Sequence, residues 1–538
     1  MKKEEIEKMV KEYEEQGYLN LETLSEALER WSRQYRDRTA LVDAKRRVTY
    51  GQLNENVRRL AGRFRREGLQ KNDNVLVQIP NSISFMEICF ALFFLGVRPV
   101  LMLPAHGERE LESVAELARP VAIITVPEDL GTDYGKRALE ISQKKSYIQK
   151  LFLTESREYG ISVYETEDIE LEELPEKPEP WDIALFLLSG GTTGTPKLIP
   201  KIHAAYLYNA AASAERCGVT GNSVYLAALS IAHDYPLCCP GMIGTLCKGG
   251  KCVISATAEA DEALSWIEKE RVTFTSIVPV VAAMWEEERE WNPSMDLSSL
   301  QYLLIGAAKL DRELAEKLER NFSCKILQGY GLGEGITCFT SPDDKKEVAW
   351  ETQGRPISAA DVIKIVDETG REVENGVSGE LTEKGPYTFL GYYRAPDLNR
   401  QIFTKDGFFK TGDKAMLNAD GNVVILGRVR EQINRAGENI IPEEIEAFIK
   451  EWNEVKEAAV IGIPDQTLGE RTCAVVVTRK RSITLAELCR FLLKQGIAAF
   501  KLPDQLVLLE GLPYINVGKV DKKKLKLLAA ERGEQYAE

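Results

Sequence analysis

The segment at residues 189–197, SGGTTGTPK, combines hydroxyl groups, glycine backbone amides and one lysine ammonium group. The apolar run at 184–188 predicts a buried strand before it, so the segment should form a loop at the edge of a sheet. Glycines allow successive N–H groups to surround an anion. The P-loop pattern GxxxxGK[ST] is absent, because Pro196 precedes Lys197 and a leucine follows it. The loop predicts phosphate binding of another kind, although such clusters also form ordinary turns.

Four further segments carry groups that suit a nucleotide or an acid. Residues 328–334 follow a predicted strand and offer an aromatic ring, glycines and a carboxylate. Residues 411–413 place an aspartate, an acceptor for ribose hydroxyls, in a predicted tight turn. Residues 434–446 lead into a predicted helix, and residues 518–522 place a lysine on a glycine-flanked loop. An aspartate in a turn is often structural and a lysine in a basic run is often only solvated, so the motifs gain meaning from their joint order.

The composition narrows the classes of protein. The 538 residues are enough for two to four domains, and 44% of them are hydrophobic. A net charge of -14 argues against broad binding to nucleic acid or to an anionic membrane. The charged N-terminal residues predict no secretory signal, and ten cysteines without CxxC pairs suit reduced thiols in a cytoplasm. Neither an HExxH zinc helix nor a GxSxG nucleophile elbow occurs.

Strand and helix patterns alternate along most of the chain. A strand pair at 39–48, a helix at 50–67, a strand at 74–79, a helix at 82–95 and a strand at 100–103 are expected. The apolar stretch at 83–103 is long enough for a membrane span, but Glu87, Arg98 and Pro99 interrupt it, so a buried helix and strand are predicted. Further strands at 122–126, 253–255, 273–278 and 302–305 predict a parallel sheet covered on both faces.

The pattern changes after about Lys384 to short strands and tight turns, including one around residues 391–393. A compact set of helices and strands begins near Arg430, with helices expected from Pro442, Leu485 and Asp521. We therefore predict an N-terminal domain at 1–429 and a C-terminal domain at 430–538, the latter of a comfortable size for a small domain.

In this order and over nearly the whole length, the motifs resemble those of the adenylate-forming superfamily, which includes acyl-CoA synthetases, nonribosomal adenylation domains and luciferases. The chain is most similar to stand-alone aryl acid AMP ligases of the 2,3-dihydroxybenzoate or salicylate type in siderophore-type pathways. The segments carrying this similarity are 189–200, 232–237, 385–388, 432–435 and 462–466. The resemblance implies an α/β fold: a large N-terminal domain of parallel and mixed sheets covered by helices, a β-barrel-like subdomain, and a small mobile α+β C-terminal domain.

The resemblance also implies the cofactors ATP and Mg²⁺ and a set of residues for them. Catalytic roles fall on Lys519, Glu334 and His233, with Glu334 also holding Mg²⁺, a cation that prefers oxygen ligands. Lys519 would bridge the attacking carboxylate and the α-phosphate, stabilising charge in the transition state. The residues implied to bind ATP are Ser189, Gly190, Gly191, Thr192, Thr193, Gly194, Lys197, Gly306, Ala307, Gln328, Gly329, Tyr330, Gly331, Asp413 and Arg428.

Within that set, the resemblance assigns particular residues to the phosphates, the adenine and the ribose of ATP. Residues 192–197 would hold the β- and γ-phosphates, and Tyr330 would lie against adenine. Asp413 would bind both ribose hydroxyls, with Arg428 nearby. The family reaction has two steps: an acid and ATP form an acyl-adenylate and pyrophosphate, and a thiol then attacks the adenylate after the C-terminal domain turns.

For the second step, the resemblance implies a hinge residue between the two domains and a channel for the thiol. Arg430 matches the hinge, and Arg430→Pro is expected to preserve pyrophosphate exchange while blocking thioester formation. Ala436 and Gly437 would line the thiol channel, where the family usually has two glycines, so Ala436 could narrow it.

The residues implied to contact the acid are Asp234, Tyr235, Cys239, Gly306, Ala308 and Thr337. Asp234 stands where aryl ligases carry asparagine and would touch the ortho substituent. An ionised aspartate only accepts hydrogen bonds, so an ortho amino group suits it better than a phenol bonded to its own carboxylate. Anthranilate-like acids are therefore expected first and salicylate second. Cys239 argues against 2,3-dihydroxybenzoate, and Thr337 leaves a hydroxyanthranilate or a pyridine carboxylate open, unless these differences are neutral drift.

The expected function is aryl acid adenylation followed by transfer to the phosphopantetheine of an aryl carrier protein. An aryl-CoA ligase, an amino-acid-activating adenylation enzyme and a non-catalytic nucleotide sensor are the alternatives. Intact Lys197, Glu334, Asp413 and Lys519 argue against the sensor. The expected partners are a small aromatic carboxylic acid and a carrier protein or CoA in the cytoplasm, with no nucleic acid and no membrane.

Overall fold

The computed structural model describes residues 3–155, 157–164, 176–189, 196–308, 310–429, 432–479, 482–515 and 519–533. One large sheet within this part is parallel except for the antiparallel hairpin of β8 and β9. Its spatial order is β7 (Ile161–Ser162), β6 (Lys150–Leu153), β5 (Ala122–Thr125), β3 (Asn74–Gln78), β4 (Arg98–Leu101), β8 (Ile183–Ser189) and β9 (Lys197–Ile202). The predicted phosphate loop thus joins the two strands at one edge.

A second large sheet is parallel in its centre and antiparallel at both ends. Its order is β16 (Arg355–Pro356), β15 (Thr337–Phe339), β14 (Lys325–Gly331), β13 (Tyr302–Ile305), β12 (Phe274–Ile277), β10 (Val224–Ala227), β11 (Lys251–Ile254), β1 (Thr39–Val42) and β2 (Arg47–Thr49).

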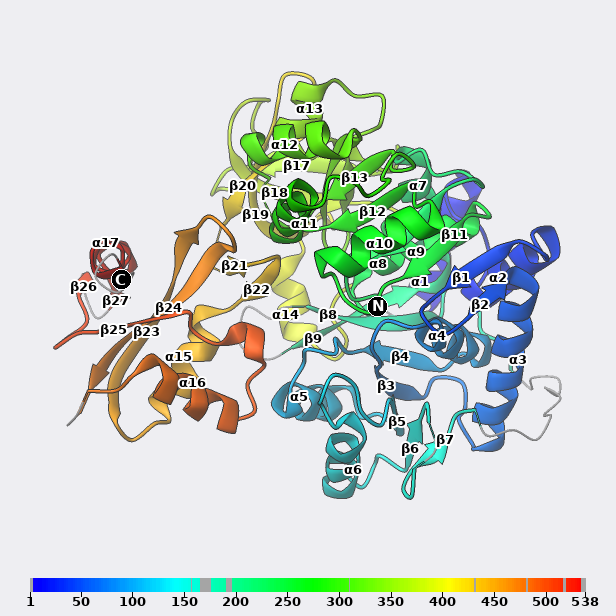
Figure 1. The fold of residues 1–538 in the computed structure, drawn as a ribbon, viewed down its shortest axis with the longest axis horizontal. Coiled ribbons are helices and arrows are strands. Elements are labelled where there is room, and N and C mark those ends of the chain that lie inside the picture. Colours follow the sequence, from blue (N-terminus) through cyan, green and yellow to red (C-terminus); the bar gives the residue numbers. More distant parts are fainter. Residues whose placement is uncertain are drawn as a thin grey trace.

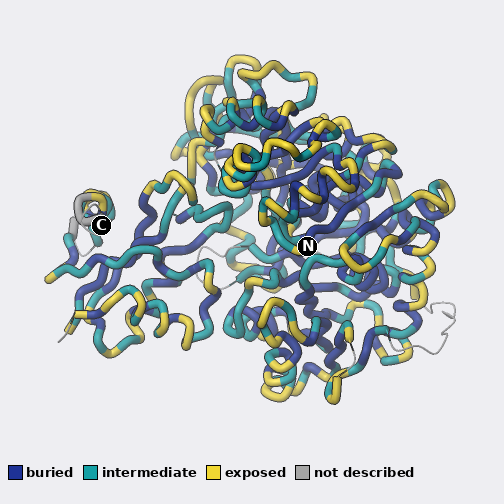
Figure 2. The backbone as a smooth tube through the Cα atoms, viewed as in Figure 1, coloured by how far each residue is buried: buried dark blue, intermediate teal, exposed yellow. Residues whose placement is uncertain are grey.

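Alternating side chains divide these sheets between cores, because successive strand residues point to opposite faces. In β3, Val75 and Val77 belong to the central core while Leu76 belongs to the core on the outer face. The central core also contains α2 (Leu24–Gln34), α3 (Tyr50–Arg66), α4 (Ile83–Leu95), α7 (His203–Arg216) and α9 (Gly241–Cys247). The outer cores contain α5 (Glu108–Ala118) and α6 (Tyr134–Lys144) on one sheet, and α10 (Ala260–Glu270), α11 (Pro279–Trp291) and α12 (Arg312–Phe322) on the other. The result is five layers, with the burial concentrated between the sheets (Figure 2).

A four-stranded antiparallel sheet follows in the described chain, in the order β17 (Val362–Val366), β18 (Gly379–Lys384), β19 (Phe409–Leu417) and β20 (Val423–Arg428). The chain from residue 432 forms another sheet with its own cores, in the order β22 (Glu438–Ile440), β21 (Ile433–Arg435), β24 (Gly469–Thr478) and β23 (Val455–Asp465), with β25 (Gln505–Leu508) against β24. Helices α15 (Pro442–Lys450), α16 (Leu485–Lys494) and α17 (Lys522–Gly533), the 3-10 turn η1 (Ala499–Lys501) and the pair β26 (Tyr514–Ile515) and β27 (Lys519–Val520) complete it. We call residues 432–533 the C-terminal part. The remaining helices are α1 (Lys3–Glu15), α8 (Asp234–Cys238), α13 (Lys346–Glu351) and α14 (Pro396–Ile402).

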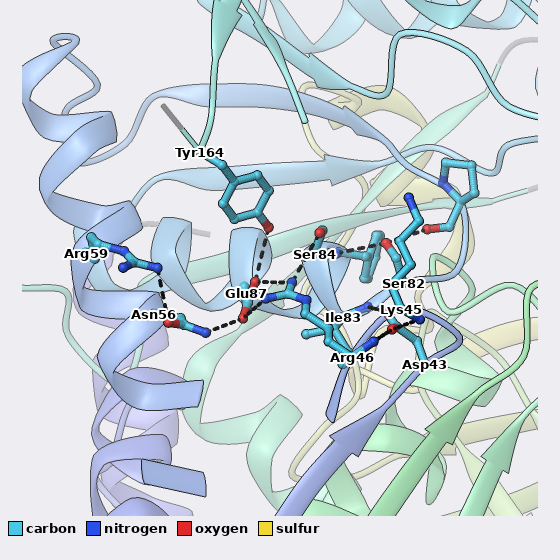
Figure 3. Close-up of polar contacts among 12 residues, drawn as sticks. Asp43, Lys45, Arg46, Asn56, Arg59, Ser82, Ile83, Ser84, Glu87 and Tyr164 are labelled. Atoms are coloured by element: carbon cyan, nitrogen blue, oxygen red, sulfur yellow. Dashed lines mark hydrogen bonds and ion pairs between the residues drawn. The ribbon is translucent and has the colours of Figure 1, made fainter. Parts of the chain in front are cut away.

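Helix α4 shows how a charge is accommodated inside the central core. Glu87 is fully buried, and its two carboxylate oxygens accept hydrogen bonds from Arg46 at 3.0 and 2.6 Å. Asn56 and Tyr164 donate to the same carboxylate at 2.7 and 3.1 Å (Figure 3). These partners satisfy a group whose burial alone would be costly. No helix of the described residues is both long and apolar enough to cross a membrane.

Most of the expected elements are observed, with three differences. The strand expected at 100–103 is β4 and begins at Arg98, because its pairing with β3 starts two residues earlier. Residues 391–393 form no strand. Residues 411–413 lie inside β19 instead of a tight turn, and the positive φ of Gly412, 72°, lets the strand continue with an irregular register. The domain boundary predicted at Arg430 falls outside the described residues and stays a prediction.

Candidate active site

A cavity of about 490 Å³ lies where the two large sheets, the four-stranded sheet and the C-terminal part meet. Its lining brings together predicted residues from distant segments: Ser189, Lys197, His233, Asp234, Gly331, Glu334, Arg428 and Gly437. Strand ends and the loops after them supply most of these side chains, the usual position of binding sites in open α/β sheets. The structure thus assembles in one place groups that the sequence spreads over 249 positions, from 189 to 437.

The carboxylate expected to bind ribose is firmly positioned. Asp413 Oδ2 accepts a hydrogen bond from the Tyr330 hydroxyl at 2.6 Å, and Oδ1 lies 2.8 Å from Arg428 Nε. Asp413 and Arg428 also face each other in the register of β19 and β20. Burial raises the pKa of Asp413, although Arg428 and Tyr330 oppose that rise. A carboxylate has further acceptor positions beyond these two contacts, so the arrangement can still serve a diol.

Glu334, the predicted metal ligand, lines the cavity on the loop after β14. Its Oε1 accepts a hydrogen bond from Tyr392 at 2.7 Å, and Lys197 Nζ lies 5.0 Å from the centre of the Tyr392 ring. Buried Lys201 donates to the Gly333 carbonyl at 2.9 Å and so supports the same loop. The resulting cluster of hydroxyl, carboxylate and ammonium groups matches the chemistry of a phosphate and a hard cation.

The motif residues 328–331 lie in β14, and they make different kinds of contact. The Gln328 side chain is buried and donates to the carbonyls of Ala349 and Trp350 at 3.0 and 2.6 Å, so it ties α13 to the sheet. Gly329 is needed for packing, because a Cβ there would lie 2.4 Å from the Phe339 ring. The nucleotide roles of these residues remain predictions.

The three residues expected to choose the acid meet beside the cavity. Cys239 Sγ lies 4.0 Å from Asp234 Oδ2 and 4.0 Å from Thr337 Oγ1. The Tyr206 hydroxyl donates to Asp234 Oδ1 at 2.7 Å, and the Asn209 amide oxygen lies 3.6 Å from Cys239 Sγ. Helix α8 begins at Asp234 and ends at Cys238, so Cys239 lies just past its end and contacts Asn209 of α7.

The neighbouring residues of the acid site are held by backbone contacts. His233 caps α8, its Nδ1 accepting from Tyr235 N at 3.2 Å, and the Tyr235 hydroxyl donates to the Leu304 carbonyl at 2.9 Å. A Cβ at Gly306 would lie 3.2 Å from that hydroxyl, so Tyr235 packs on the backbone there. Ala307 and Ala308 form a bend after β13.

A second cavity of about 910 Å³ adjoins the first and shares His233 and Gly437 with it. Ala436 lines it as well, with a left-handed φ of 54°. Asn434 Nδ2 donates to the Ala307 carbonyl at 2.8 Å, which seats the loop between β21 and β22 on the large sheet. The predicted thiol-channel residues therefore stand at the junction of the two cavities.

Several predicted residues fall outside this description. Gly190, Gly191, Thr192, Thr193, Gly194 and Arg430 are not among the described residues, nor is the side chain of Lys519. The backbone of Lys519 belongs to β27, at the end of the C-terminal part that lies farthest from the large sheets (Figure 1). In this arrangement the channel loop, and not β27, adjoins the pocket.

Sequence reasoning missed the side chains that orient the predicted ones. Tyr392, Tyr206, Asn209 and Lys201 each touch a site residue or its loop. The signal for Lys201 was its place at the end of the phosphate-loop hairpin, and Tyr392 lay in a segment read as structural. Tyr206 and Asn209 had no signal, because they follow the ordinary spacing of a buried helix.

Comparison with known proteins agrees with this geometry. A family model described as "AMP-binding enzyme" matches residues 28–393, and one described as "AMP-binding enzyme C-terminal domain" matches residues 444–519. The chain therefore belongs to the AMP-binding enzyme family, and the resemblance to adenylate-forming ligases is confirmed.

Particular relatives match over almost the full length. "Pyochelin synthase PchD" of Pseudomonas aeruginosa is 42% identical, covering 96% of this chain and 94% of that protein. "2,3-dihydroxybenzoate-AMP ligase" of Bacillus subtilis is 38% identical, covering 98% and 97%. Among solved structures, the apo structure of Mycobacterium smegmatis MbtA has a TM-score of 0.75 at 35% identity and covers 97% of each chain. The expected two-domain α/β fold class is confirmed.

Proposed function

We propose that this chain adenylates an aromatic carboxylic acid with ATP and then transfers the aryl group to the phosphopantetheine thiol of a carrier protein. The observation that carries the proposal is the meeting of Asp234, Cys239 and Thr337 beside a cavity whose other walls hold Glu334 and Arg428. Family membership and the name of the B. subtilis relative support an aryl acid as the substrate class.

In the first step the carboxylate of the acid attacks the α-phosphorus of ATP, and pyrophosphate leaves. Lys197 and the loop before it would hold the leaving phosphates, while Asp413 and Arg428 would fix the ribose. Lys519 would neutralise the charge that grows between carboxylate and phosphate. Mg²⁺, bound through Glu334, would supply charge neutralisation on the phosphates, and the oxygen donors around Glu334 fit such a cation.

The ortho substituent of the acid would face Asp234. Tyr206 already donates to Oδ1, whereas the Cys239 thiol, a weak donor, lies 4.0 Å from Oδ2. An ortho amino group would donate to Oδ2 and satisfy the carboxylate. This supports an anthranilate-like acid first and salicylate second.

In the second step the thiol attacks the acyl carbonyl and AMP leaves. Among the described residues lining the second cavity, Arg137 is the one cation, and its Nη1 already donates to the His106 carbonyl at 3.2 Å. Glu108, Asp129 and Glu438 line the same cavity. Three carboxylates against one engaged cation would repel the nucleotide end of CoA, which favours a carrier-borne phosphopantetheine.

The test is ATP–pyrophosphate exchange with a panel of benzoates, pyridine carboxylates and amino acids, followed by thioester formation with a phosphopantetheinylated carrier or CoA. We expect exchange with anthranilate above salicylate, loss of exchange in Lys519→Ala, and a shift towards salicylate in Asp234→Asn. Exchange only with an α-amino acid would contradict the aryl assignment. A wild-type preference for salicylate would contradict only the argument from Asp234.

A further inference from the structure

The C-terminal part meets the large domain at a buried ionic contact on one side of the 490 Å³ cavity, whose lining includes Glu110, Glu444 and Lys501. Lys501 Nζ in η1 lies 3.2 Å from Glu110 Oε1 in α5 and 2.8 Å from Glu444 Oε1 in α15. The side chains of all three are at most 11% exposed. Glu110 belongs to the large domain, whereas Lys501 and Glu444 belong to the C-terminal part. The carboxylate of Glu110 therefore completes a charge cluster that spans both.

Backbone contacts around Glu110 make the interface specific. Ala498 N donates to Glu110 Oε1 at 3.4 Å, and Gly107 N donates to Oε2 at 3.0 Å. The backbones are close there, since a Cβ at Gly107 would lie 2.7 Å from the Gly496 carbonyl oxygen. One carboxylate thus caps its own helix and accepts from the opposite domain.

Arg109 extends the contact on the neighbouring side of α5. Its guanidinium lies 3.6 Å from the centre of the Phe448 ring in α15, a cation–π distance, and its Nη2 lies 3.8 Å from Glu451 Oε1. Two adjacent residues of α5 therefore contact the C-terminal part: Arg109 contacts helix α15, and Glu110 contacts the segment after α16.

The position of these contacts relates them to one of the two half-reactions. With α5 docked in this way, Gly437 lies at the pocket and β27, which carries Lys519, lies at the far end of the C-terminal part (Figure 1). A rigid C-terminal part that turned to bring β27 to the pocket would withdraw α15 and η1 from α5. Lys501 would keep Glu444 as its partner, and Glu110 would regain water, so the contact can open without stranding a buried charge.

We propose that Glu110 and Arg109 are positioning residues for thioester formation: they hold the C-terminal part in the arrangement that places the Gly437 loop at the pocket. This inference rests on the proposed function, because it assigns the contact to the second of its two steps. It predicts that loosening the contact slows thiol transfer and leaves adenylation unchanged or faster.

The main variant is Glu110→Gln, in which the amide oxygen still accepts from Gly107 N but the charge facing Lys501 is gone. Glu112→Gln is the matched control, since Glu112 lies on the same helix, lines neither cavity and pairs with Lys144 of the large domain at 2.9 Å. Lys501→Met tests the contact from the other side, with Lys522→Met as its control, because Lys522 pairs with Glu443 within the C-terminal part at 3.4 Å.

Two measurements on the full chain decide the matter. In single turnovers from preformed aryl-adenylate, Glu110→Gln and Lys501→Met should form thioester at least tenfold more slowly, with pyrophosphate exchange equal to or above wild type. Hydrogen–deuterium exchange should rise at residues 107–111 and 496–501 in both variants and in neither control. The double variant should be little worse than either single one, because the two residues share one contact.

An equal fall in both half-reactions, or unchanged transfer with unchanged deuterium uptake, would overturn the inference. If the wild-type protein exchanges pyrophosphate with none of the acids, the proposed function fails. The deuterium result would then still decide whether Glu110 and Lys501 hold the two domains together.

Discussion

The pocket walls from the large domain and the wall from the C-terminal part are built differently. Asp413 in β19 and Thr337 in β15, which lie beside the pocket, are at most 3% exposed and belong to sheets with buried cores. Asn434, Ala436 and Gly437 are only partly buried. They touch the large domain through one hydrogen bond from the Asn434 side-chain amide and through the packing of Gly437 against Val278 and Ala307. Groups for the first step are thus preformed, whereas the loop for the second step is held by contacts that can be broken.

The largest effect should come from the preformed side. Asp413→Asn removes the charge that pairs with Arg428 and accepts from Tyr330 in a buried place. A hydrogen bond from the ribose to a charged acceptor is worth about 1.5–3 kcal/mol, so its weakening should lower kcat/KM for pyrophosphate exchange by up to roughly a hundredfold.

Exposed Asp406→Asn, in the turn before β19, is the control for this change and should leave exchange unaltered. Steady-state exchange kinetics with varied ATP measure both. Wild-type kinetics in Asp413→Asn would show that the carboxylate is structural only.

A smaller effect, confined to thiol transfer, is expected from a change in the loop between β21 and β22. Gly437 has a φ of 90°, and a Cβ there would lie 3.1 Å from Val278 Cγ1 and 3.5 Å from Ala307 Cβ. Gly437→Val combines a strained backbone with this overlap, at about 1–3 kcal/mol, so thiol transfer should fall about tenfold or more. Pyrophosphate exchange should stay within about twofold. If pyrophosphate exchange falls as far as thiol transfer, the loop of the C-terminal part does not serve the second step alone.

Acid should destabilise the large domain, because folding lowers the pKa of two of its histidines. All three histidines belong to the large domain, and burial lowers the pKa of His203 to about 3 and that of His106 to about 4. Their unfolded pKa is near 6.5, so below that pH the unfolded chain takes up protons that the folded one does not. The free energy of unfolding therefore falls as pH drops from 6.5 towards 4, by about 1.4 kcal/mol per pH unit for His106 and for His203.

His203→Gln keeps an acceptor for Leu24 N, which donates to His203 Nδ1 at 3.3 Å, and removes one of these protonation sites. Between pH 7.5 and 5.5 its Tm should fall less than that of wild type, by differential scanning calorimetry. Parallel curves for the two proteins would mean that His203 is not the group responsible.

The smallest effect is expected at Ala436, whose φ of 54° costs a residue with a Cβ about 1 kcal/mol relative to glycine. Ala436→Gly should raise the rate of thiol transfer by about twofold at most, since it frees the channel loop and removes a methyl group. Exchange should not change. Slower transfer in this variant would indicate that the methyl group helps to shape the channel.

Many of the helices and strands could be predicted from the local spacing of apolar residues. Helices α3 and α4 and strands β3 and β13 match the expected elements closely, because spacing of apolar residues along the chain is a local property. Errors arose where a residue's partner is distant. Asp413 was expected in a turn because Gly-Asp pairs favour turns, but pairing with β20 draws it into a strand.

The sequence by itself determined the motif types, their order and hence the family, because each motif is a run of neighbouring residues with its own chemistry. Tertiary structure alone decided which of them meet: Tyr330 with Asp413, Tyr392 with Glu334, Asp234 with Cys239 and Thr337. It also turned the Gln328 side chain to α13 and brought Lys501 to Glu110. These contacts follow from how sheets and domains pack, and no local spacing encodes the distance between two segments that are far apart along the chain.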